Sequence, residues 1–67
     1  MRSLAELQAC SPENLFSTAE AALYLSKRPG LLREWRMAGR GPRFIKQIHY
    51  VDYRKRDLDA WLMDCIR

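Results

Sequence analysis

Residues that build metal centres and cross-links are scarce in this chain. Its 67 residues include two cysteines, Cys10 and Cys65, and a single histidine, His49. These three side chains lack the spacing of a metal-ligand set, so we expect free thiols and no bound metal. Neither a nucleophile–base pair nor a phosphate-binding loop is recognisable. We therefore expect no catalytic residue, no cofactor and no enzymatic activity.

Long apolar runs are absent as well. No stretch approaches the roughly 18 apolar residues of a membrane span, and Glu6 and Gln8 interrupt the apolar stretch that a signal peptide would need. We expect a cytoplasmic protein without membrane association. With 48% hydrophobic and 30% charged residues, the composition is that of one small globular domain. Its thin core leaves little room for a small-molecule substrate.

Positive charge is distributed unevenly along the chain. Residues 27–56 contain ten of the twelve Lys and Arg residues and only two of the eight acids. This segment has a net charge of +8 and the other 37 residues have −4, which together give the overall +4. Such segregation predicts a surface for a polyanion, and duplex nucleic acid is the first candidate.

Capping boxes predict where the first two helices begin. Ser3 and Glu6 form the S-x-x-E pattern of a short helix that ends near Ala9. We interpret residues 1–14 as an appendage to a domain over residues 15–67. A second box at 17–20 opens a helix that runs to about residue 25, with an inward face made of Ala19, Ala22 and Leu23.

Proline and glycine delimit the next helix. Pro29 suits its first position, and Gly39 marks its end after Ala38. The periodicity points Leu32 and Trp35 inward.

The C-terminal part of the chain predicts a hairpin and a last helix. Segments 44–46 and 50–53 are rich in β-branched and aromatic residues, which predicts two paired strands. A helix over about 56–66 places one apolar stripe inward, made of Leu58, Trp61, Leu62 and Cys65. We expect the aromatic core to contain Trp35, Trp61, Phe44 and Tyr53. The fold class is therefore mostly α with a small β-hairpin.

Two of the predicted helices have helix–turn–helix spacing. Intervals of three, seven and three residues separate Ala22, Leu25, Leu32 and Trp35, which is typical of DNA-binding pairs. Ser26 stands at a turn position often held by glycine. The outward face of the second helix would present Arg33, which can form two hydrogen bonds with guanine. The alternative is a solvated basic helix face without a partner.

The segments FSTAEAALYLSKRPGLLREWRMAGRGPRFIK and VDYRKRDLDAWL resemble a known family. The chain is similar to the small winged helix–turn–helix group of phage and integrative-element excisionases, which includes AlpA-like regulators and is related to MerR-type DNA-binding domains. The resemblance covers about residues 15–62. It implies a helix–turn–helix, a two-stranded wing and a C-terminal helix. The recognition helix would enter the major groove, with the wing near the minor groove or the backbone.

The resemblance also implies which residues contact DNA. Arg28 and Arg33 would contact bases, and Arg36, Arg40, Arg43 and Lys46 would contact phosphates. The full set of expected contacts is Lys27, Arg28, Gly30, Leu31, Arg33, Arg36, Met37, Arg40, Arg43, Lys46, His49 and Arg54. The wing departs from the family because it has no glycine, so we expect a loop wider than a two-residue turn. At this loop, Ile48 is either a wedge between bases or an exposed loop residue, and His49 either touches a phosphate or is merely exposed.

The implied function is that of a recombination directionality factor. Such a protein binds and bends attachment-site DNA, so that an integrase excises a mobile element in a bacterial or phage-infected cell. Its partners would be double-stranded DNA, the integrase and neighbouring protomers, with residues 1–14 as one source of protomer contacts. Two alternatives remain open: an AlpA-like transcriptional regulator, and a protein-interaction module that has lost DNA binding.

Overall fold

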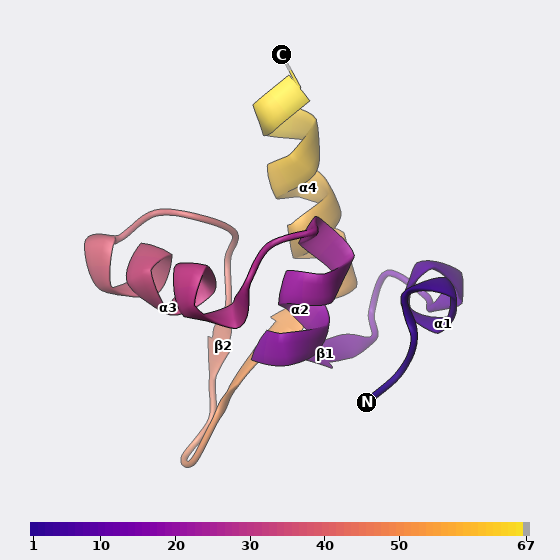
Figure 1. The fold of residues 1–67 in the computed structure, drawn as a ribbon, viewed down its shortest axis with the longest axis horizontal. Coiled ribbons are helices and arrows are strands. Elements are labelled where there is room, and N and C mark those ends of the chain that lie inside the picture. Colours follow the sequence, from indigo (N-terminus) through magenta and orange to yellow (C-terminus); the bar gives the residue numbers. More distant parts are fainter. Residues whose placement is uncertain (67) are drawn as a thin grey trace.

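The computed structural model describes residues 1–66 as a small, mostly helical chain with one three-stranded antiparallel sheet (Figure 1). The elements in chain order are α1 (Leu4–Ala9), β1 (Leu15–Ser17), α2 (Thr18–Leu25), α3 (Pro29–Ala38), β2 (Ile45–Lys46), β3 (Val51–Arg54) and α4 (Lys55–Ile66). Figure 1 shows the β2–β3 hairpin projecting from the helices, with α1 and α3 on opposite sides of α2. None of the helices in residues 1–66 is long and apolar enough to cross a membrane.

Both predicted capping boxes are confirmed. Ser3 accepts a hydrogen bond from the backbone N–H of Glu6, and the Glu6 carboxylate accepts one from the N–H of Ser3. Ser17 and Glu20 repeat the arrangement at the start of α2. Each box satisfies backbone donors that would otherwise lack partners at the first turn.

The turn between α2 and α3 is tight. Ser26 ends α2 in the left-handed conformation, with φ 60° and ψ 41°, and the N–H of Lys27 reaches back to the carbonyl of Ala22 at 2.8 Å. Pro29 occupies the first turn of α3, and Gly39 ends that helix with φ 72°. The positions predicted for proline and glycine are therefore confirmed.

The predicted hairpin is confirmed, and a third strand joins it. β3 pairs with β2 on one side and with β1 on the other, in the order β1-β3-β2. Phe16 of β1 lies opposite Tyr53 of β3, and both side chains are buried. β1 escaped prediction because its three residues run directly into the capping box, where Ser17 is both the last strand residue and the N-cap of α2.

One core joins every helix and the two longer strands. Its buried members are Leu7, Phe16, Ala21, Ala22, Leu25, Leu32, Tyr53 and Leu58. Leu7 comes from α1 and is fully buried. The buried Lys55 ammonium donates to the carbonyls of Gln8 and Cys10 at 2.7 Å each. Residues 1–14 are thus packed into the domain, which corrects their interpretation as an appendage.

A second link attaches the N-terminus to α2. The Arg2 guanidinium binds Glu20, with Nε 2.9 Å from Oε2. This hydrogen bond, with help from the backbone N–H of Ser17, lowers the pKa of the Glu20 carboxyl to about 2 against the opposing effect of burial. On the other side of α2, Tyr24 donates to Asp59 of α4. Burial first, and then Asp59, raises the pKa of Tyr24 to about 12.

Three side chains expected in the core lie elsewhere. Ala19 is exposed and Ala21 is buried instead, in a helix that packs against α1 as well as α3. Phe44 is 42% exposed, since it precedes β2 at the surface and lies beside the ring of Tyr53. Cys65 is exposed because the end of α4 extends away from the other elements (Figure 1). Trp35 and Trp61 are half-buried, with ring centroids 4.9 Å apart.

Candidate nucleic-acid interface

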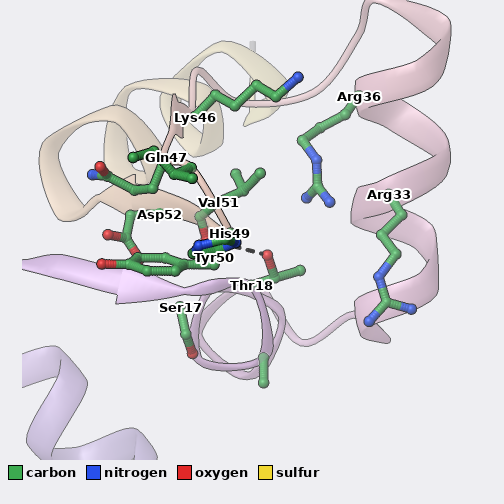
Figure 2. A pocket seen from close by; sticks show the side chains of 12 residues that line it. Ser17, Thr18, Arg33, Arg36, Lys46, Gln47, His49, Tyr50, Val51 and Asp52 are labelled. Carbon is green, nitrogen blue, oxygen red and sulfur yellow. Dashed lines mark hydrogen bonds between the residues drawn. The ribbon is translucent and has the colours of Figure 1, made fainter.

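An open groove of about 740 Å³ lies between α3, the hairpin and the start of α2 (Figure 2). Its lining is Ser17, Thr18 and Ala19 at the α2 end, Arg33 and Arg36 on α3, and Lys46, Gln47, Ile48, His49, Tyr50, Val51 and Asp52 on the hairpin. Four of the side chains predicted to bind DNA therefore come together here: Arg33, Arg36, Lys46 and His49. Asp52 is the one acid among the lining residues.

Two arginines on α3 line the groove, but they are held differently. Arg33 and Arg36 lie three positions apart, so they share one face of the helix. Figure 2 shows Arg36 extending toward the hairpin and Arg33 extending alongside α3. The Arg36 guanidinium donates to the Tyr53 hydroxyl at 2.7 Å and lies 5.8 Å from the ring centroid of Phe44. Arg33 is exposed and forms no ion pair within the described part of the chain.

The hairpin supplies the opposite wall. Lys46 of β2 is exposed, and no ion pair within residues 1–66 engages it. Four residues, 47–50, connect the strands, and the N–H of Gln47 donates to the carbonyl of Tyr50 at 2.8 Å. No residue of this loop has a positive φ. The expectation of a loop wider than a two-residue turn is confirmed.

The start of α2 connects the hairpin to the helices. Thr18 donates to the carbonyl of Val51 at 3.5 Å, drawn as the dashed line in Figure 2. Ser17 lies opposite Asp52 in the sheet. Because β1 continues into α2 and pairs with β3, the hairpin and the helix pair share one support.

A second basic hollow lies on the other side of Arg36. Its volume is about 570 Å³, and four of its lining side chains are Arg36, Arg40, Arg43 and Arg54. Arg54 is 3.8 Å from the Glu13 carboxylate. Most of this hollow is formed by the connector after α3, where two glycines precede Pro42.

The remaining predicted residues lie on α3 or directly before it. Lys27 and Arg28 are exposed, and the Arg28 guanidinium lies 3.9 Å from Glu34. Leu31 is half-buried, and Met37 is 90% exposed. A β-carbon on Gly30 would meet nothing within 4 Å, so the surface there is open.

The basic surface has fewer free cations than the charge count suggested. Lys55 is buried under α1, and Arg56 forms an ion pair with Glu13, which Arg54 also approaches. Sequence reasoning could not detect this neutralisation, because Glu13 lies more than 40 residues before the cations that it approaches.

Several residues of the groove were not predicted. Ser17, Thr18 and Ala19 line it because β1 brings the start of α2 beside the hairpin, and β1 itself carried no recognisable signal. Tyr50 is 63% exposed on the hairpin loop. The lack of a glycine in this loop was the only sequence signal for an unusual connection.

No protein-family model matches the chain, and no curated protein is significantly similar to it. Within residues 1–66, no group of three or more His, Cys, Asp or Glu side chains is placed to hold a metal ion.

Proposed function

We propose that this chain is a winged helix–turn–helix protein that binds duplex DNA sequence-specifically. In this proposal α3 is the recognition helix, α2 is its supporting helix and the β2–β3 hairpin is the wing. The left-handed turn at Ser26 and the buried Leu25 and Leu32 support the assignment, because a helix–turn–helix needs a close, fixed crossing.

One observation carries the proposal. Arg33 and Lys46 line the same groove from α3 and from the hairpin, and neither is neutralised by an acid within the described residues. Exposed cations on both walls of an open groove fit a ligand with phosphates along two edges, as a duplex has. Arg36 is already held by Tyr53, so its contact with a phosphate would cost little side-chain freedom on binding.

The resemblance of LREWR, GRGPRF and DLDAWL to excisionases favours one biological role. The chain would bind attachment-site DNA next to an integrase and favour excision of a mobile element. A single domain with few base contacts binds weakly, so adjacent protomers on the DNA would increase the affinity. An excision assay with the integrase of the same element tests this role, and a promoter-reporter assay tests the alternative role of AlpA-like regulator.

The DNA-binding proposal itself is tested by fluorescence anisotropy across a salt series, on a random duplex and a native-element duplex. We expect the logarithm of the affinity to fall linearly with the logarithm of salt, with a slope that corresponds to about four or more phosphates. The native duplex should remain bound at the higher salt concentrations. A protein that binds neither duplex at low salt would instead fit a protein-interaction module.

Single substitutions separate base contacts from phosphate contacts. Arg33→Ala should weaken binding to the cognate site by about 1–3 kcal/mol and relax the base preference. Arg43→Ala should weaken binding to all duplexes alike. Arg56→Ala is the matched control, since Arg56 is paired with Glu13 and does not line the groove. Unchanged affinity in both of the first two variants would contradict the assignment.

A further inference from the structure

The hairpin loop carries a strongly exposed apolar side chain. Ile48 is 92% exposed, more than any other large apolar residue among those described. An isolated exposed isoleucine is not unusual in itself. Here, however, Ile48 belongs to the loop that closes the projecting β2–β3 hairpin (Figure 1), and it lines the same groove as Arg33 and Lys46.

The loop has few of the side chains that wings commonly insert into a minor groove. Loop residues 47–50 contain no Lys or Arg, and the nearby Asp52 adds negative charge. Proteins that sense the negative potential of a narrow minor groove insert Arg, Lys or His. His49 is the only loop residue of that kind, and it is exposed. The loop has two exposed apolar side chains, Ile48 and Tyr50, and Ile48 is the more exposed of the two.

The loop is supported well enough to act as a wedge. β3 is paired on both sides, by β1 and by β2, and the hydrogen bond from Gln47 to Tyr50 closes the loop. Thr18 adds a hydrogen bond from α2 to the carbonyl of Val51 at the start of β3. When the loop inserts into a ligand, the sheet and α2 together would therefore resist displacement of the loop.

We infer that Ile48 inserts between two adjacent base pairs from the minor groove and kinks the duplex. This inference rests on the proposed DNA-binding function and adds to it the mode of contact of the wing. Apolar wedges of this kind unstack one base step and bend DNA by about 20–90° toward the major groove. Pyrimidine–purine steps unstack most easily, so we expect a TA or CA step under the hairpin. Lys46, which ends β2 next to the loop, would neutralise a phosphate beside that step.

A fluorescent base reports the unstacking directly. The probe is a short G·C-rich duplex with one central TA step, in which 2-aminopurine replaces the adenine. Its fluorescence rises when the base leaves the stack. Saturating wild-type protein should raise the fluorescence, and energy transfer between dyes at the duplex ends should report a bend of about 20–90°. Low salt allows binding without a known recognition site.

Three variants give the inference its controls. Ile48→Ala should retain binding within about fivefold, because much of the contact energy of a wedge is offset by unstacking, yet lose most of the fluorescence rise and the bend. Ile48→Leu should restore both signals. Met63→Ala, an exposed apolar truncation on α4 away from the hairpin, should leave both unchanged.

A cationic replacement distinguishes a wedge from a charge effect. Ile48→Lys should increase the salt dependence of binding by about one phosphate contact while abolishing the fluorescence rise. If wild type binds and Ile48→Ala keeps the full fluorescence rise and bend, the wedge is overturned and the proposed function stands. If wild type binds no duplex, both fail together. Thermal unfolding of each variant should match wild type, since Ile48 makes no buried contact.

Discussion

Ser26 and Gly41 show how single residues set the path of the chain around α3. Ser26 is the one non-glycine residue in 1–66 with a positive φ. Gly41 also has a positive φ, of 87°, and a β-carbon there would lie 2.9 Å from Cε3 of Trp35. The first position tolerates a side chain with strain, whereas the second has no space for one.

Replacing Ser26 with glycine should stabilise the fold. The left-handed conformation costs an L-residue about 1–2 kcal/mol. Glycine removes this cost, but it also makes the unfolded chain more flexible, which lowers the stability by about 0.4–1 kcal/mol. We expect a net increase of about 0.5–1 kcal/mol in the free energy of unfolding, measured by urea titration. Ser26→Ala keeps the β-carbon and should change stability little. A glycine variant no more stable than wild type would show that this turn carries no strain.

Two glycines after α3 form a matched pair. Gly39→Ala should destabilise by about 1 kcal/mol, because φ is 72° but no atom lies within 4 Å of the added carbon. Gly41→Ala meets the same conformational penalty and also the Trp35 ring, so we expect a loss of about 2–3 kcal/mol. Thermal unfolding followed by tryptophan fluorescence measures both. Equal losses would mean that the Trp35 contact relaxes freely.

At the scale of elements, the helices were predictable because their signals are local. Capping boxes, Pro29 and Gly39 each act within a few residues, and all gave the correct boundaries to within one residue. β1 was not predictable, since a three-residue strand gains its stability from β3, more than 30 residues later in the chain. The residues predicted to bind DNA include some that line the groove on α3 and on the hairpin, but none at the start of α2. The α2 wall of the groove depends on β1 and was missed with it.

The stability that the Arg2–Glu20 contact between the N-terminus and α2 provides should depend on pH. The pKa of Glu20 is about 2 in the folded chain, below its ordinary value of 4.5. A lowered pKa stabilises the fold fully above the ordinary value and loses this effect as the pH falls toward 2. We expect Glu20 to contribute on the order of 2–3 kcal/mol above about pH 5, lost progressively below it.

Unfolding titrations between about pH 7 and pH 2 measure this dependence. Glu20→Gln should be less stable than wild type at pH 7 and should show a shallower loss in acid. Glu13→Gln is the control for an exposed ion pair, because Glu13 pairs with Arg56 at the surface, where such a pair contributes little to stability. If the curves of wild type and Glu20→Gln ran parallel through the acid range, the Arg2–Glu20 pair would not be the cause of the acid sensitivity.

For the whole molecule, the packed N-terminal segment determines what the minimal folded unit is. The sequence resemblance began near residue 15, but Leu7 fills the same core as Phe16 and Leu58. Sequence motifs show only which residues are alike between proteins. They do not show which further residues are needed to fill the core of this chain. The domain boundary could therefore not be obtained from motifs alone.

Removing residues 1–14 should unfold or strongly destabilise the domain. The deletion uncovers the core at Leu7, removes both acceptors of the Lys55 ammonium and leaves Glu20 without Arg2. We expect a loss of more than about 4 kcal/mol, comparable to the whole stability of a small domain. Circular dichroism with urea titration measures it.

Two leucines on α1 provide a finer test of the same point. Leu7→Ala should lower the free energy of unfolding by about 2–4 kcal/mol, because the side chain is fully buried. Leu4→Ala, on the same helix but 37% exposed, should lower it by less than about 1 kcal/mol. Equal effects, or a stable deletion variant, would restore the view of residues 1–14 as an appendage.

The continuity of β1 with α2 has a mechanical consequence. Ser17 ends the strand that holds β3 and also caps the helix that supports α3, so the two walls of the groove are joined at one residue. The hairpin therefore cannot move away from the start of α2 without breaking the β1–β3 pairing or the N-terminal cap of α2. A ligand that enters the groove must therefore adjust its own width to fit, and the free-energy cost of that deformation is borne by the ligand.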